Sequence, residues 1–261
     1  MFDFHMHSRV SFDSKANPMD MALAAKTMGL REICFTDHID IGGEQPDRSM
    51  CFLPEVYDEA YDTLEVPGLQ IRRGFEFGLG EGLIPVLEEE ARRRQYDFIL
   101  GSVHFVGIYD VYFDAFWQGK TQRQAHLDFL EETLRQVQHN DCFDVLAHLT
   151  FLSKATANPT HEVIRYRDHR ELVDEILKTL ADKGKGLEVN TSGVDICGEY
   201  LPSMEYLRRF KELGGQIVTV GSDAHAPNRV GQYCHQAVAL LGEIFGYVCT
   251  FENRKPVFHK V

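Results

Sequence analysis

The chain alternates between strand-like and helix-like segments along most of its length. The strand-like segments are short apolar runs, and the helix-like segments repeat apolar residues at helical spacing. One helix is marked at both ends, because Asn17 and Pro18 are typical of a helix start and Gly29 of a helix end. The expected strands cover residues 2–7, 32–37, 69–78, 96–104, 143–150, 186–192, 216–225 and 247–253.

This order repeats a strand followed by a helix about seven times. Such alternation predicts a parallel sheet with helices packed outside it. For a chain of 261 residues with this many units, a closed or nearly closed β/α barrel is favoured over an open sheet. No GxGxxG motif follows the first strand, which weakens a dinucleotide-binding alternative. We expect one α/β domain that spans residues 1–261.

The first expected strand carries two histidines, His5 and His7, one residue apart. Side chains alternate faces along a strand, so both rings would share a face with Asp3, about 7 Å apart. Two imidazoles so placed can converge on one ion. An isolated pair of this kind is also common in ordinary strands with a polar face, so this stretch alone leaves both interpretations open.

The other expected strands favour the metal interpretation, because most of them also end in His, Asp or Glu. In a β/α barrel the carboxyl ends of the strands meet at one face, where catalysis is placed. These side chains are therefore expected to lie close together although they are far apart in the sequence. The full set is His5, His7, Asp37, His38, Glu76, His104, His148, Asp223 and His225.

All of these candidate ligands are nitrogen or oxygen donors, which suits zinc, manganese or iron. They outnumber the ligands of one tetrahedral ion, so we expect two or three ions with Glu76 as a bridge. Such a cluster can hold a hydroxide and clamp a phosphoryl group. The other histidines fall mostly in expected helices or loops and are interpreted as structural or solvated: His126, His139, His161, His169, His235 and His259.

Composition limits the partners and the compartment. The net charge of −13 argues against nucleic acid as the main partner, because phosphate backbones need clustered Lys and Arg. No apolar run is long enough for a membrane span, and no signal peptide is visible. The six cysteines form no CxxC pair, and Cys34 lies in an apolar run where a buried thiol is expected. We therefore expect a cytoplasmic chain with reduced thiols and a small phosphorylated substrate, and the oligomeric state stays open.

The motifs together resemble the PHP (polymerase and histidinol phosphatase) superfamily of metallophosphoesterases, nearest to the histidinol-phosphate phosphatases. The resemblance covers essentially the whole chain. It implies a distorted seven-stranded β/α barrel with three divalent metal ions. The motifs are "FHMHSRVSFDS", "EICFTDHID", "GFEFG", "FILGSVHFV", "VLAHLT", "GLEVNTSG" and "VTVGSDAHAPNRVG".

The resemblance also implies which residues hold each ion. The first ion would be bound by His5, His7, Glu76 and Asp223, and the second by Glu76, His104 and His148. The third would be bound by Asp13, His38 and His225. Asp13 stands where the family often has a histidine; aspartate is also an acceptable hard ligand, although a capping role is the alternative.

Arginines are the expected partners of the substrate phosphate. The resemblance points to Arg165 first, and then to Arg167 and Arg229. A solvated arginine at a helix start is the alternative for the first two. Many family members carry a further arginine just after "NTSG", where this chain has Val194 and Asp195. This departure affects the identity of the expected substrate more than the expected phosphoester hydrolysis.

The expected activity is hydrolysis of L-histidinol phosphate to L-histidinol and phosphate, a step of histidine biosynthesis. A hydroxide that bridges the metals would attack phosphorus, with Glu76, His104 and Asp223 in the catalytic site. Asp37 would protonate the leaving group or support a ligand. One alternative is a PHP phosphoesterase acting on a nucleotide or another small phosphorylated metabolite. A second is a non-catalytic PHP regulatory module.

Overall fold

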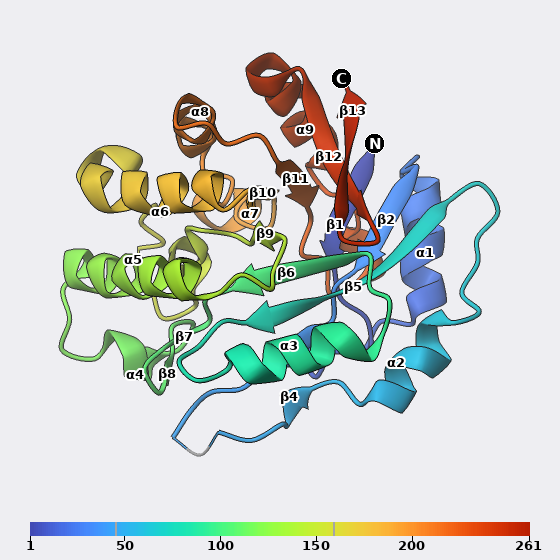
Figure 1. Ribbon diagram of the computed structural model, residues 1–261, viewed down its shortest axis with the longest axis horizontal. Helices are drawn as coiled ribbons and strands as arrows, with labels where there is room; N and C mark the ends of the chain where they lie inside the picture. The colour runs from blue at the N-terminus through green and yellow to red at the C-terminus, as the bar shows by residue number, and fades with distance from the viewer. Residues whose placement is uncertain (45, 159) are drawn as a thin grey trace.

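Seven parallel strands form the sheet at the centre of the molecule (Figure 1). The computed structural model describes residues 1–44, 46–158 and 160–261. In spatial order the strands are β1 (Phe2–Met6), β2 (Glu32–Phe35), β5 (Gln70–Gly78), β6 (Phe98–Ser102), β9 (Val145–Leu146), β10 (Gly186–Asn190) and β11 (Val218–Gly221).

The sheet nearly closes into a barrel, because its first and last strands also meet. The His7 N–H donates to the Ala224 carbonyl at 2.9 Å, and the Asp223 N–H donates to the His5 carbonyl at 2.7 Å. Met6 and Ala224 form a parallel bridge. The predicted α/β barrel is confirmed. Its closure brings the first ligand motif, with His5 and His7, beside the last one, with Asp223.

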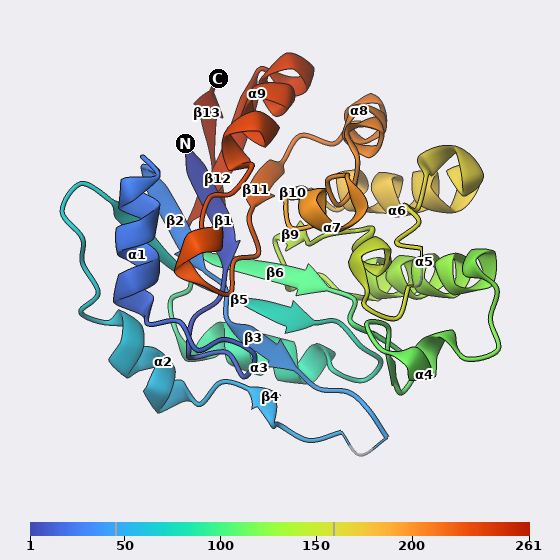
Figure 2. The same cartoon turned by 180° about the vertical axis from the view of Figure 1, so that it is seen from behind.

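Helices surround the strands, as Figures 1 and 2 show from opposite sides. Helix α1 begins as predicted: the Asn17 side chain accepts the Met19 N–H at 2.9 Å, Pro18 is its first residue, and Gly29 has a φ of 74°. The helices are α1 (Pro18–Thr27), α2 (Pro54–Tyr61), α3 (Ile84–Arg93), α4 (Asp114–Trp117), α5 (Gln122–His139), α6 (Arg170–Asp182), α7 (Val194–Cys197), α8 (Met204–Glu212) and α9 (Cys234–Phe245).

Two strands differ from the sequence-based expectation. The run after β2 is interrupted, and β3 (His38–Asp40) then pairs with β5 and with β4 (Met50–Cys51). Residues 247–253 were expected to be another strand of the repeat, but β12 (Tyr247–Glu252) pairs antiparallel with β13 (Lys255–Lys260) in a separate hairpin. The sequence of an apolar strand does not specify which strand it pairs with. Only the tertiary structure therefore distinguishes a barrel strand from a strand of a separate hairpin.

Aromatic packing shows that strict alternation along β1 also fails. The register between β1 and β2 shifts between Asp3 and Met6. Phe4 packs edge-on against Phe98 of β6, with ring centroids 5.6 Å apart, and Phe98 contacts Phe251 of β12. Phe4 therefore packs against the side chain of another strand. The irregular register lets His5 and His7 point into the site above this packed layer.

No helix in the described part of the chain is long and apolar enough to cross a membrane.

Candidate metal centre and cavity

The predicted ligands meet at the carboxyl ends of the strands. His5 and Glu76 lie on β1 and β5, while His104, His148 and Asp223 follow β6, β9 and β11. Glu76, His104, His148 and Asp223 line the floor of a cavity of about 470 Å³, and His5 lies directly beside Glu76. Parallel strands place their carboxyl ends at one face, so the closed barrel gathers donors that are over two hundred positions apart.

Glu76 lies at the centre of this group. Its Oε2 is 3.0 Å from His5 Nε2 and 3.4 Å from His7 Nε2, while Oε1 is 2.9 Å from His148 Nε2. The His5 and His7 Nε2 atoms lie 3.1 Å apart. Ligands of one tetrahedral zinc, with Zn–N bonds near 2.0 Å, are separated by about 3.3 Å. The carboxylate of Glu76 therefore has histidine nitrogens close to both of its oxygens, at spacings that metal ligands can adopt.

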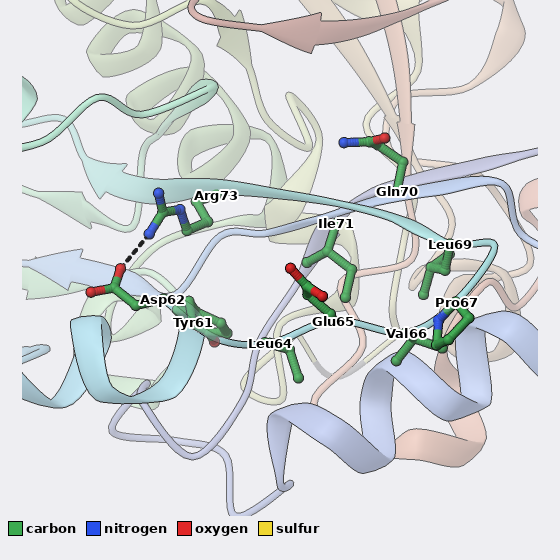
Figure 3. A pocket seen from close by; sticks show the side chains of 10 residues that line it. All are labelled: Tyr61, Asp62, Leu64, Glu65, Val66, Pro67, Leu69, Gln70, Ile71 and Arg73. Atoms are coloured by element: carbon green, nitrogen blue, oxygen red, sulfur yellow. Dashed lines mark hydrogen bonds and ion pairs between the residues drawn. The ribbon is translucent and has the colours of Figure 1, made fainter.

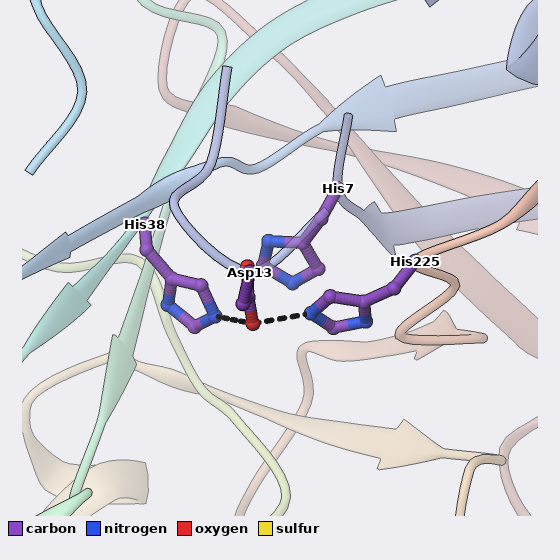
Figure 4. A group of neighbouring side chains, drawn as sticks. All are labelled: His7, Asp13, His38 and His225. Atoms are coloured by element: carbon purple, nitrogen blue, oxygen red, sulfur yellow. Dashed lines mark hydrogen bonds and ion pairs between the residues drawn. The ribbon is translucent and has the colours of Figure 1, made fainter. Parts of the chain in front are cut away.

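Figure 4 shows a second group of neighbouring side chains, His7, Asp13, His38 and His225. Asp13 Oδ2 is 2.8 Å from His225 Nε2 and 3.4 Å from His38 Nε2, and the ring of His7 stacks between those of His38 and His225, with centroids 4.3 and 4.2 Å away. The donor atoms of these four residues lie within 4.8 Å of one another. Asp13 is thus placed as a ligand would be, although it lies in a loop.

The structure adds a carboxylate that the sequence analysis did not select. Asp40, on β3, is buried, and its Oδ2 lies 2.9 Å from His104 Nδ1 and 3.4 Å from His38 Nδ1. Among the described residues, His38 Nδ1 and Asp40 Oδ1 are buried without a hydrogen-bond partner. Unpartnered buried polar atoms are costly, so the donor set fits bound cations. The signal was available, since Asp40 is two residues from His38 on the same strand.

A buried acid orients two of the histidines from behind. Glu188 of β10 lies with Oε1 2.7 Å from His5 Nδ1, and its Oε2 accepts the backbone N–H of His148 at 2.8 Å. Carboxylates that hold the second ring nitrogen of a ligating histidine fix its tautomer and its direction. His5 therefore presents Nε2 to the cavity floor.

The pKa shifts in this group run in both directions. Burial acts to lower the pKa values of His5, His38 and His104, but neighbouring carboxylates outweigh it and raise all three. Burial acts to raise the pKa of Glu76, but His5 and His38 outweigh it and hold that pKa well below its ordinary value. Burial, reinforced by His225 and His38, holds the pKa of His7 well below the usual range. Ionised carboxylates and neutral imidazoles are the forms that bind metal ions.

Two cationic side chains line the cavity beside these donors. The ammonium group of Lys154, in a short 3₁₀ helix (Phe151–Lys154), donates to Asp223 and, at 2.8 Å, to Ser192. Arg229 lies on the rim, and its Nη1 donates to Asp195 Oδ2 at 2.6 Å. Lys154 was missed in the sequence analysis. It follows His148 closely in the chain, but no sequence pattern around it marks a functional lysine.

Arg165 and Arg167 are not brought to the cavity. Both are exposed, with Arg165 just before the short 3₁₀ helix Tyr166–Asp168 and Arg167 within it, and neither lines the cavity. The interpretation of a solvated arginine before a helix therefore describes them better than contact with phosphate.

Asp37 lies below the cavity floor. It is completely buried, accepts the Tyr61 hydroxyl, and accepts the Ser8 N–H at 2.8 Å. Burial raises the pKa of Asp37 to about 6. Because it does not line the cavity, its position favours support of the loop after β1 over direct proton transfer to a substrate.

A second hollow, of about 420 Å³, lies at the other end of β5 (Figure 3). Its side chains come from the end of α2, the following loop and the start of β5. Arg73 and Asp62 pair across it, with Nη1 and Oδ1 2.5 Å apart. Among the residues that the structure describes, none of the grouped metal donors lies in this hollow.

Comparison with known proteins identifies the family. A family model described as PHP domain matches residues 3–192. The chain belongs to the PHP family. Histidinol-phosphatase of Lactococcus lactis is 31% identical over 97% of this chain and 95% of its own length. A probable histidinol-phosphatase of Thermotoga maritima is 28% identical, with all of both chains covered.

Solved structures agree with this assignment. The Lactococcus lactis histidinol phosphate phosphatase, crystallised with zinc, L-histidinol and phosphate, superposes with a TM-score of 0.90 at 29% identity and covers 98% of each chain. A structure of a histidinol phosphatase homologue from Listeria monocytogenes reaches 0.72 at 18% identity, covering 90% of this chain and 99% of its own, which supports the fold.

Proposed function

We propose that this chain is a metal-dependent phosphomonoesterase that hydrolyses L-histidinol phosphate to L-histidinol and phosphate. The observation that carries the proposal is the shared carboxylate of Glu76, which has histidine nitrogens near both oxygens in the cavity of a PHP barrel. Similarity over the full length to histidinol-phosphatases supports the choice of substrate. This activity would place the chain in histidine biosynthesis and in the cytoplasm.

The donor groups support three ion positions. His5, His7, Glu76 and Asp223 would hold the first ion. Glu76, His104 and His148 would hold the second, and Asp13, His38 and His225 the third. The donor types suit zinc, manganese or iron. Bound ions would supply Lewis acidity and a nucleophile derived from water at neutral pH.

The chain's own residues would bind and orient the phosphate. The ammonium of Lys154 has three N–H donors, and two are used by Asp223 and Ser192. The third remains for a phosphate oxygen above the floor. Arg229 offers a second cation at the rim. Lys154 and Arg229 would thus replace the arginine that many family members carry at the position of Asp195. They would stabilise the charge that develops on the phosphoryl oxygens.

Substitution of Glu76 tests the proposal. Glu76→Gln keeps the shape but removes the bridging charge, so turnover of L-histidinol phosphate should fall by about a thousandfold, the scale of losing a major charge stabiliser. Glu90→Gln is the matched control, because Glu90 is also a buried glutamate but bonds to Tyr96 away from the cavity. The readout is phosphate release together with metal content. Turnover of Glu76→Gln equal to that of the wild type would refute the proposal.

A further inference from the structure

One acidic residue in the cavity is not explained by the metal centre. Five carboxylates line the cavity: Asp13, Asp40, Glu76, Asp110 and Asp223. Four of them have a histidine or lysine nitrogen within 4.0 Å. Asp110 has no such nitrogen among the residues that the structure describes. A carboxylate at a half-buried position without a counter-charge is costly, so a ligand that supplies the charge would be bound there.

Asp110 is held rigidly beside the floor. It lies on β8 (Tyr109–Asp110), opposite Phe105 of β7 (Phe105–Val106), and the Val111 N–H donates to the His104 carbonyl at 2.9 Å. The Asp110 Oδ1 atom accepts the Tyr112 backbone N–H at 2.9 Å. Its Oδ2 accepts no hydrogen bond from the described residues. The hairpin therefore holds Oδ1 of Asp110 in place and leaves Oδ2 for a ligand. Asp110 is paired with Phe105, the residue next to His104.

Aromatic rings continue from the floor to the rim on this side. Phe151 lies 4.7 Å from the ring of His148, Tyr112 lies 5.8 Å from Phe151, and Phe113 lies 5.5 Å from Tyr112, measured between centroids. Phe113 is 58% exposed and lines the cavity mouth. Ring faces attract cations and planar groups. An acid beside aromatic rings is chemically suited to an organic cation that carries a ring.

The cavity thus offers groups that suit both halves of a substrate. Lys154 and Arg229 offer positive charge for a phosphate, whereas Asp110 and the rings offer negative charge and apolar surface. Resting on the proposed function, we infer that Asp110 is a specificity-determining residue that binds the positively charged amino group of the alcohol released by hydrolysis. The contact would be a charge-assisted hydrogen bond from the ammonium to Oδ2.

A substrate comparison tests this inference. The probes are L-histidinol phosphate and 3-phenylpropyl phosphate, which has a ring and a similar chain but no amino group. Asp110→Asn keeps the oxygen that accepts the Tyr112 N–H and removes the charge. We expect its kcat/KM for L-histidinol phosphate to fall at least about tenfold, while kcat/KM for 3-phenylpropyl phosphate changes less than about twofold.

Asp114→Asn is the matched control, because Asp114 is an exposed acid of the same segment that does not line the cavity. It should leave both rates unchanged, and thermal melting should show both variants folded. Equal losses on both probes, or no loss on either, in an enzyme that hydrolyses L-histidinol phosphate would overturn the role of Asp110 alone. If the wild type released phosphate from 3-phenylpropyl phosphate but not from L-histidinol phosphate, the proposed substrate and this inference would both fail.

Discussion

At the scale of single residues, the metal donors and Arg229 were visible in the sequence, whereas the cation Lys154 was not. Apart from Asp37, the histidines and acids at the strand ends lie where the sequence analysis expected them, in overlapping groups whose donor atoms lie within 4.8 Å of one another. The phosphate partner was expected to be an arginine, yet Lys154 is the cation beside Asp223. Lysine is a point charge with rotatable donors, so it can serve an ion ligand and a phosphate from one position.

Replacing Lys154 should separate phosphate binding from folding. Lys154→Met keeps the length of the side chain and removes the charge, so kcat/KM should fall about ten- to a hundredfold, the effect of losing a hydrogen bond to a charged group. Inhibition by inorganic phosphate should weaken in parallel, and Lys154→Arg should recover part of both. Lys178→Met is the control, since Lys178 is exposed on α6 and pairs with Asp182 of the same helix. Unchanged inhibition by phosphate in Lys154→Met would contradict this role.

At the scale of secondary structure, the close approach of β11 to β1 sets the position of the floor. Gly221 ends β11, and a Cβ at this position would overlap His5 Cβ and Glu188 Oε1. Glycine here is a packing requirement, because it lets the closing strand reach the strand that carries the histidines. The "VGSDAH" stretch therefore contributes a small residue as well as ligands.

Gly221→Ala should damage both stability and metal binding. Overpacking of this kind costs about 1–3 kcal/mol in the free energy of unfolding, and His5 would be pushed from its place. The measurements are urea unfolding and metal content after dialysis. Gly184→Ala is the comparison, because Gly184 has a φ of 64° with open space around it; it should lose stability but retain its metal. Full metal content in Gly221→Ala would argue against a packing role in the site.

At the scale of the whole molecule, the barrel depends on its centre for stability. Many of the gathered donors are fully buried, and like charges packed together repel unless ions or protons compensate them. Bound ions would therefore stabilise the fold as well as supply the chemistry. The net charge of −13 is compatible with bound metal ions, because their positive charge would offset part of it locally.

Removal of metal should lower the melting temperature. An ion present at a hundred times its Kd stabilises by about 2.7 kcal/mol, and 1 kcal/mol corresponds to about 2–4 °C for a chain of this size. Chelation should therefore lower Tm by at least about 5 °C, and added zinc or manganese should restore it. In Glu76→Gln the restoration should be reduced. A Tm that is identical with and without chelator would contradict a multinuclear centre.

Much of the architecture could be predicted because its signals are local. Helix α1 carries its own start and stop residues, and the apolar strands with polar ends recur in a β/α order that permits few topologies. The antiparallel hairpin of β12 and β13 could not be separated from a barrel strand, because an isolated apolar run does not specify its partner. The irregular register of β1 was hidden for the same reason.

The sequence by itself determined the barrel class and most of the donor set, Asp40 excepted, since strand order and residue type at strand ends suffice to bring those donors to one face. Only the tertiary structure decided the walls of the cavity. Lys154, Asp110 and the pair of Arg229 with Asp195 lie on short helices, hairpins and loops. Their positions depend on contacts between distant segments, and no local periodicity encodes such contacts.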